Sequence, residues 1–154
     1  LIQGMIDFAP SNMTYRLAEV NIDIAEKKYS RAIEKLENGL ELVPGNHPIT
    51  MHLARAYFEA GRYTDADRLL SAHTRNKPTN AHLWYVLAEV QGLAGNTLGL
   101  HQSRAEYFAL NGALGQGIEQ LKLARPLARD NVTREKIQRR IEFFNQVGAA
   151  LQQL

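Results

Sequence analysis

Three prolines recur in this chain at intervals of 34 residues, and each is followed two positions later by an asparagine. The prolines are Pro10, Pro44 and Pro78, and the asparagines are Asn12, Asn46 and Asn80. A fixed period of this length indicates an array of structural repeats. Proline cannot continue a helix, because it lacks an amide hydrogen. We therefore expect each proline to end one helix and each asparagine to cap the start of the next.

Small and apolar residues recur at the same interval. Gly61 and Gly95 follow the first helix expected in a unit, where a left-handed backbone ends a helix at little steric cost. The other recurring pairs are Leu53 and Leu87, Ala54 and Ala88, Tyr29 and Tyr63, Ala32 and Ala66, and Leu36 and Leu70. This pattern is typical of tetratricopeptide (TPR) repeats, which are stacked helix–turn–helix units. A generic helical bundle is the alternative.

The period predicts an all-α fold, a TPR-type α-solenoid of antiparallel helix pairs with a C-terminal capping helix. We expect a single TPR domain over residues 1–154. Residues 1–12 would end a truncated preceding repeat, so the chain would be a fragment of a longer protein. The expected repeats are 13–46, 47–80, 81–112 and about 98–130, and the expected capping helix is 131–152.

The pattern departs from a regular period in two places. Leu17 and Ala18 lie two residues too early relative to Tyr29, which predicts a longer first helix or a small bulge. The third unit loses its register, and a new match begins half a period later. We therefore expect one helix over 98–110 that closes the third unit and opens the fourth. The residues of the new match are Ala105, Phe108, Gly112, Leu114, Leu121 and Ala124.

The last segment predicts one amphipathic helix that caps the array. Its apolar side would hold Ile137, Ile141, Phe144, Gly148 and Leu151. Its basic cluster is expected to be a solvated helix face, with a phosphate or acidic-partner patch as the alternative. The cluster consists of Arg134, Lys136, Arg139 and Arg140. The net charge of +2 is too small to indicate a nucleic-acid partner, and no apolar run is long enough to span a bilayer.

Catalytic and metal-binding motifs are absent from the sequence. There is no cysteine, no His-Glu-x-x-His and no Gly-x-Ser-x-Gly. We expect no catalytic residue, no metal site and no cofactor in this chain. The glycine-rich run 111–117 is interpreted as a turn between helices. The histidines are expected to be polar surface or groove residues, and they are His47, His52, His73, His82 and His101.

A concave groove lined by the first helices is the predicted site of protein binding. Tyr85 and Phe58 would supply contact area there, and charged side chains would fix register. The alternative is that Arg55, Glu89 and Glu106 pair with one another and only solubilise the groove. The candidate groove residues are Met51, His52, Arg55, Phe58, His82, Tyr85, Glu89, Gln102 and Glu106, and the groove positions of the fourth unit also include Ser103 and Leu110.

One class of peptide ligand is not expected in this groove. Met51 and Arg55 stand where the TPR clamps of chaperone tails carry lysine and asparagine, so a C-terminal carboxylate ligand of that kind is not expected.

Two longer stretches resemble a known family. Residues 101–112 read HQSRAEYFALNG and residues 118–124 read IEQLKLA, and both are similar to the C-terminal TPR region of BepA-like bacterial zinc metalloproteases. The stretches YFEAGRY at 57–63 and LAEV at 87–90 are also similar. The resemblance covers most of residues 12–146.

In that family a zinc protease domain precedes the repeats, and the protein works in the periplasm of Gram-negative bacteria. It acts there in the assembly and quality control of outer-membrane β-barrel proteins. The resemblance implies that this chain is the non-catalytic recognition half, with zinc in a protease domain outside it. Its implied partners are that domain, the barrel-assembly machinery and substrate proteins. The alternative is a stand-alone TPR scaffold of an envelope assembly or secretion complex.

Overall fold

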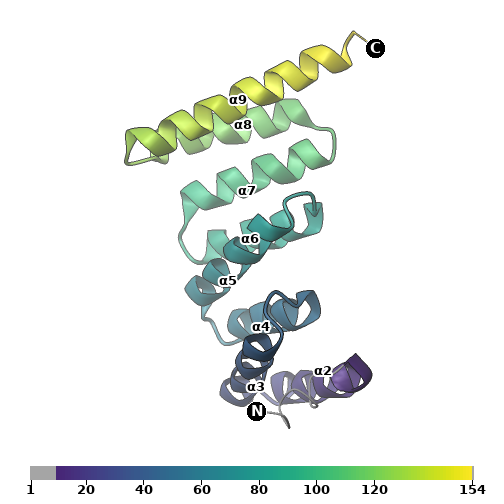
Figure 1. Cartoon of the computed structure of the whole chain (residues 1–154). Coiled ribbons are helices and arrows are strands. Elements are labelled where there is room, and N and C mark those ends of the chain that lie inside the picture. The colour runs from purple at the N-terminus through teal and green to yellow at the C-terminus, as the bar shows by residue number, and fades with distance from the viewer. Residues whose placement is uncertain (1–9, 154) are drawn as a thin grey trace. The chain divides into compact units, whose positions relative to one another are not determined.

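The computed structural model describes residues 10–153, and eight α-helices and one short 3-10 helix follow one another along them (Figure 1). None of these residues forms a β-strand, which confirms the all-α TPR fold. The elements are α2 (Pro10–Ala25), α3 (Tyr29–Leu42), α4 (His47–Glu59), α5 (Tyr63–Asn76), α6 (Ala81–Leu93), α7 (Thr97–Leu110), α8 (Leu114–Ala124), η1 (Arg125–Leu127) and α9 (Asn131–Leu151).

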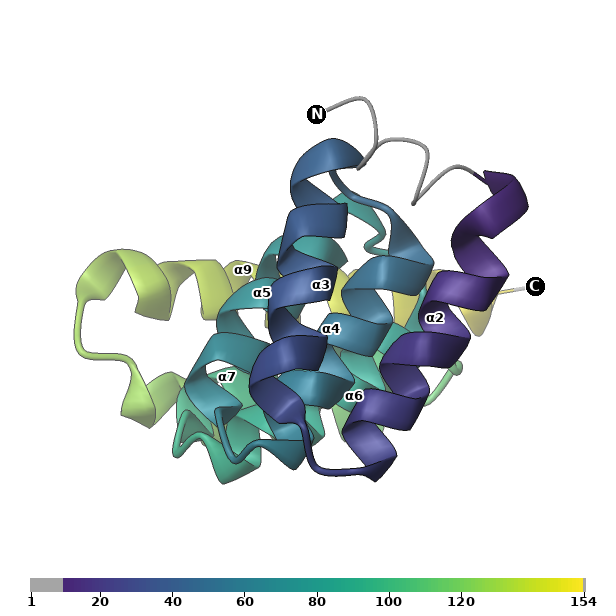
Figure 2. The same ribbon diagram turned by 90° about the horizontal axis from the view of Figure 1, so that it is seen from below.

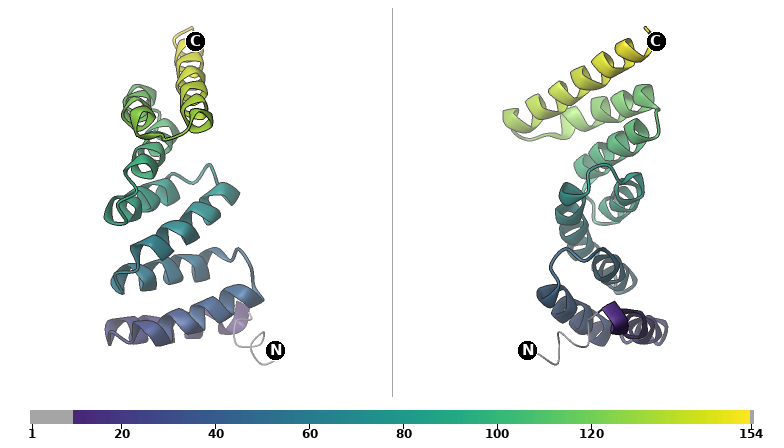
Figure 3. Two further views of the ribbon diagram at one scale, coloured as in Figure 1. Left: turned by 90° about the vertical axis from the view of Figure 1, so that its left-hand side faces the viewer. Right: turned by 45° about the vertical axis from the view of Figure 1, so that its right-hand side comes forward.

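The chain divides into two compact units, the first ending at His73 and the second beginning at Thr74. In the first unit, α3 packs against both α2 and α4 (Figure 2). In the second unit, α7 packs between α6 and α8, and α9 covers α8 (Figure 3). Residues 97–110 therefore form one helix that packs against a neighbour on each side, as the half-period match predicted.

Asparagine caps begin three of the helices. The side chains of Asn46 and Asn80 accept hydrogen bonds from the backbone three residues later, at 3.1 and 3.2 Å, as predicted. Asn96 caps α7 in the same way, at 3.0 Å, and was not foreseen. In the first repeat, Pro10 was predicted to end a helix and Asn12 to cap the next one. This prediction is wrong, because α2 begins at Pro10 and Asn12 lies inside it. Proline is well tolerated in the first turn of a helix. Residues 1–9, predicted to form the end of a preceding repeat, lie outside the described residues.

Left-handed residues end the first helix of each pair. Gly61 and Gly95 have φ of 73° and 75°, as expected. The equivalent position 34 residues before Gly61 is Lys27, which has φ of 60°. Val20 is buried at the position equivalent to Ala54, whereas Ala18 is exposed. The period therefore continues through α2 without a bulge, and the prediction that placed Leu17 and Ala18 at this position is wrong.

A buried polar residue occupies the same repeat position in α2, α4 and α6. Asp23, Tyr57 and Gln91 stand 34 residues apart and are only 5%, 8% and 4% exposed. Each is satisfied by a different side chain, since a buried polar group without a partner is destabilising. Asp23 accepts from Lys35 at 2.8 Å, Tyr57 donates to Glu37, and Gln91 accepts from Ser103 at 2.7 Å.

Ser103 was predicted to line the groove, but only 2% of it is exposed. Its hydroxyl points to Gln91 and links α7 to α6. The predicted position is wrong because the face of α7 that carries Ser103 packs against α6.

A hydrophobic cluster in the second unit joins α7, α8 and α9, with Ala128 from the segment that precedes α9. Its buried members are Ala105, Leu121, Ala124, Ala128, Ile137, Ile141 and Phe144. Gly117 allows close packing here, because a Cβ at this position would lie 3.0 Å from the Ala105 carbonyl oxygen and 3.0 Å from the Phe144 ring. The turn predicted over residues 111–117 is shorter than expected. α8 begins at Leu114, so only residues 111–113 connect α7 to α8. Leu151, predicted on the apolar side of the cap, is 58% exposed.

Candidate functional site

An open crevice lies between α6 and α7 in the second unit. Its volume is about 270 Å³, and three aromatic rings, one carboxylate and one guanidinium contribute to it. The lining residues are Tyr85, Ala88 and Glu89 from α6, and Arg104, Tyr107 and Phe108 from α7. Tyr85 and Glu89 lie one turn apart and therefore on the same face of α6. Ala88, which precedes Glu89 in the sequence, is buried. Its small side chain permits the close approach of α7.

Tyr85 is the most prominent aromatic side chain of the crevice, and 45% of it is exposed. Its hydroxyl donates a hydrogen bond to Glu89 Oε1 at 2.8 Å. This hydrogen bond to the carboxylate raises the pKa of the Tyr85 phenol. The Tyr85 ring lies 5.6 Å from that of Tyr107, and Tyr107 lies 5.6 Å from Phe108. These spacings are typical of favourable aromatic pairs.

Glu106, another predicted groove residue, is engaged by the capping helix. Arg140 of α9 donates from Nε at 2.7 Å and also from a second guanidinium nitrogen, so the pair is bidentate. The Arg140 guanidinium also lies over the rings of Phe143 and Phe144, at 4.9 and 4.7 Å from their centroids. The cluster thereby ties α9 to α7, and Arg140 is not simply part of a solvated basic face.

The remaining candidates of α6 and α7 do not line the crevice. His82 is exposed and Gln102 is half-buried.

Four predicted groove residues lie on α4 in the first unit. Arg55 is exposed, Met51 is half-buried, and the Phe58 ring packs edge-on against Tyr63 at 5.5 Å. His52 Nδ1 hydrogen-bonds the Pro48 carbonyl at 2.9 Å, which requires the hydrogen to be on Nδ1 because a carbonyl oxygen only accepts. The prediction that α4 and α6 share one groove stays a prediction.

Two histidines that the spacing analysis treated as surface residues lie together. His73 is only 4% exposed, and its ring stacks on His47 with centroids 5.2 Å apart. The Nδ1 atom of His47 lies 2.9 Å from Nε2 of His73, so one nitrogen donates and the other accepts. The surface or groove interpretation is therefore wrong for His73. The pair joins α4 to α5, and their separation of 26 residues concealed it.

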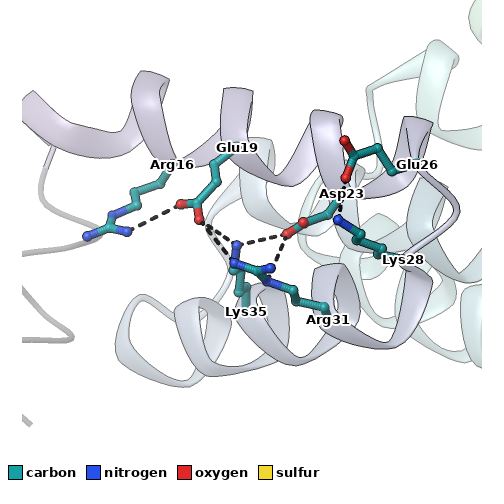
Figure 4. A network of polar contacts seen from close by, with 7 residues as sticks. All are labelled: Arg16, Glu19, Asp23, Glu26, Lys28, Arg31 and Lys35. Atoms are coloured by element: carbon teal, nitrogen blue, oxygen red, sulfur yellow. Dashed lines mark hydrogen bonds and ion pairs between the residues drawn. The ribbon is translucent and has the colours of Figure 1, made fainter.

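A polar network joins α2 to α3 (Figure 4). Lys35 donates to Glu19 at 2.6 Å and to Asp23 at 2.8 Å, and Arg31 approaches both carboxylates. The Lys35 hydrogen bonds lower the pKa of both carboxylates. These groups neutralise one another, so the network stabilises the helix pair and leaves no carboxylate raised toward general-acid chemistry.

Burial raises the pKa of the Tyr57 phenol to about 12, with a further contribution from the hydrogen bond to Glu37. The Tyr57 hydroxyl is therefore a neutral donor at physiological pH, and it links α4 to α3.

No group of three or more His, Cys, Asp or Glu side chains could hold a metal ion within residues 10–153. In the same part of the chain, no helix has the length and apolar character needed to cross a membrane.

Comparisons with known proteins identify the repeats and one group of relatives. A family model described as Tetratricopeptide repeat matches residues 23–90. The chain is 30% identical over 123 residues to the "Beta-barrel assembly-enhancing protease" of Escherichia coli (strain K12). The aligned residues make up 80% of this chain and 25% of that protein. The Yersinia pestis protein of the same name is 30% identical over 121 residues, 77% of this chain and 24% of that protein. The chain therefore spans about a quarter of the length of these curated relatives, and the resemblance to their family is confirmed.

Proposed function

Because this chain is a TPR domain homologous to a region of Beta-barrel assembly-enhancing protease, we propose that it is the recognition region of a metalloprotease of that kind. In this proposal the chain binds proteins and performs no catalysis. Zinc belongs to a protease domain outside the chain, and the whole protein acts in the periplasm on the assembly and quality control of outer-membrane β-barrel proteins. The 30% identity over 80% of the chain is the observation that supports the proposal most strongly.

The proposed binding surfaces are the exposed residues of α4 in the first unit and, separately, the predicted groove residues of α6 and α7 in the second unit. Arg55 on α4 and Tyr85 on α6 have side chains that a partner can reach, since the first is exposed and the second is 45% exposed. Aromatic side chains and arginines are the residues that most often dominate binding energy at protein interfaces. The proposed partners are the protease domain of the same protein and the barrel-assembly machinery.

The test compares partner affinity with thermal stability in matched variants. Tyr85→Ala should weaken partner binding by about 1–2 kcal/mol or more, because it removes an exposed aromatic anchor. Arg55→Glu should weaken binding in a way that depends on salt, since it acts through charge. Both variants should keep the melting temperature of the wild type. Leu70→Ala is the control for stability, because Leu70 is fully buried and its truncation should lower the melting temperature.

Unchanged partner affinity in both Tyr85→Ala and Arg55→Glu would contradict the proposal that these residues bind the partner. If substitutions at Arg68 or Arg139 abolished binding instead, the partner would lie on another face. Both of these arginines are exposed, with side-chain exposures of 79% and 76%, so either can be replaced without disturbing the core.

A second test concerns the absence of catalysis in this chain. Purified alone, it should hold no stoichiometric zinc and should leave casein uncut, because a zinc site needs three or four ligands at defined spacing. One tightly held zinc per chain, or cleavage that persists after rigorous purification, would overturn this proposal. The coding sequence upstream of Leu1 separates the proposal from a stand-alone scaffold. A His-Glu-x-x-His motif there supports the protease, and a lipoprotein signal or further repeats support the scaffold.

A further inference from the structure

The crevice between α6 and α7 is small, and three of its six lining residues are aromatic. Its volume of about 270 Å³ lies just below the range of about 300–1,000 Å³ in which small-molecule and cofactor sites fall. It is therefore better matched to a single side chain of a protein partner than to a whole cofactor. Three rings surround it, and rings of this kind bury large apolar areas with few rotatable bonds.

The charges at the crevice decide which side chain it can accept. Glu89 disfavours an anionic side chain, and Arg104 disfavours a cationic one, since both line the same crevice. An uncharged aromatic ring is compatible with both. It can pack against Tyr85 and Tyr107, and a guanidinium such as that of Arg104 stacks well on aromatic faces.

We propose that this crevice binds one aromatic side chain of an extended protein segment, with the ring packed against Tyr85, Tyr107 and Arg104. The inference rests on the proposed protein-binding function and specifies the chemistry of the partner. Glu89 would hold the backbone of the same segment. Tyr85 uses Oε1 of this carboxylate, and a carboxylate has acceptor capacity for several donors, including a backbone N–H of the bound segment.

The hydrogen bond between Tyr85 and Glu89 also prepares the crevice for binding. It fixes the orientation of an exposed ring that would otherwise rotate, so less conformational freedom is lost when the segment binds. Tyr107 and Phe108 are half-buried and are held by their own ring contacts. The site is thus formed before the partner arrives.

The experiment uses capped pentapeptides of glycine and serine that differ only in the central residue, which is phenylalanine, leucine or lysine. Binding to the ¹⁵N-labelled chain is followed by amide chemical-shift changes. The phenylalanine peptide should bind about fivefold more tightly than the other two, because an aromatic pair adds to the effect of buried area alone. The shifts should concentrate at residues 85–89 and 104–108.

Two variants and one control test the location. Tyr85→Ala and Tyr107→Ala should both remove the preference for phenylalanine. Tyr15→Ala should retain it, because Tyr15 is 78% exposed and does not line the crevice.

Tightest binding of the lysine peptide, or a phenylalanine preference that survives both crevice variants, would overturn the inference. So would the absence of shifts at 85–89 and 104–108 with the phenylalanine peptide in large excess. If no peptide binds but partner affinity still falls in the groove variants, this inference fails while the proposed function stands. If the phenylalanine peptide binds as expected but the protein partners do not, the crevice assignment stands and the proposed partners are wrong.

Discussion

Replacing Gly117 by alanine should destabilise the second unit, although alanine is the better helix former. In a helix interior, alanine is favoured over glycine by about 1 kcal/mol. At this position, however, the new Cβ would lie 3.0 Å from the Ala105 carbonyl oxygen and 3.0 Å from the Phe144 ring. Neither neighbour can move freely, because one is the backbone of α7 and the other is a ring that is 1% exposed. Overpacking of this kind costs about 1–3 kcal/mol.

The matched control is Gly115→Ala in the same helix. A Cβ at Gly115 would meet no atom within 4 Å, so only the helix preference remains, and the variant should gain up to about 1 kcal/mol. The two variants should therefore differ by about 1–3 kcal/mol in the free energy of unfolding, because only Gly117→Ala introduces the clash.

Urea unfolding followed by tryptophan fluorescence measures this difference. Trp84 is the only tryptophan of the chain and lies on α6, so its fluorescence reports on the second unit. With a denaturant slope of about 2 kcal/mol per molar, the midpoints should differ by about 0.5–1.5 M. A midpoint for Gly117→Ala that equals or exceeds that of Gly115→Ala would refute the close packing described for α8.

Three further substitutions test other contacts. Lys27→Gly should raise the free energy of unfolding by about 0.5–1 kcal/mol in urea titrations, because glycine adopts a φ of 60° without steric conflict; a loss would contradict the left-handed backbone. A double-mutant cycle between Glu106→Gln and Arg140→Gln should give a coupling free energy of about 1 kcal/mol. The value is modest because 40% of the Arg140 side chain is exposed to solvent, which screens the interaction. Zero coupling would refute the bidentate pair. Lys35→Met should make the loss of stability in acid shallower. The hydrogen bond from Lys35 lowers the pKa of Asp23 in the folded state. The stability that Asp23 contributes is therefore present above its unfolded pKa and is lost as pH falls through its folded pKa, below about pH 4. If the stability of Lys35→Met depended on acid as that of the wild type does, Lys35 would not be the cause of the lowered pKa.

Helix ends were predictable wherever the residue type matched the local requirement. Glycine at 61 and 95 favours a left-handed backbone, and asparagine at 46 favours an N-cap, so the 34-residue period located these helix ends correctly. The same position in the first pair carries Lys27, whose side chain gives no such signal. The register of α2 was therefore misplaced toward Leu17, although the period itself continues.

The candidate site was only partly predictable for a different reason. Tyr85 and Glu89 follow from the groove positions of a first helix, but α7 packs against helices on both sides. The half-period match left open which face of α7 remains accessible, so Arg104 and Tyr107 were not assigned to the crevice. The partner of Glu106 was also hidden, because Arg140 lies 34 residues later and on a helix expected only to cap the array.

The buried polar residue at one repeat position makes these repeats chemically different from one another. In consensus engineering, each position of a repeat is averaged over all copies, and the resulting units are stacked at will. Averaging would fail here, because Asp23 depends on Lys35 and Gln91 depends on Ser103, and either residue moved alone would be buried without its partner. Both of these pairs lie within one repeat and move together with a whole unit, so the constraint falls on a designer who averages or exchanges single positions. Tyr57 and Glu37 belong to adjacent repeats, so exchanging either of these two units alone would separate a buried hydroxyl from its acceptor.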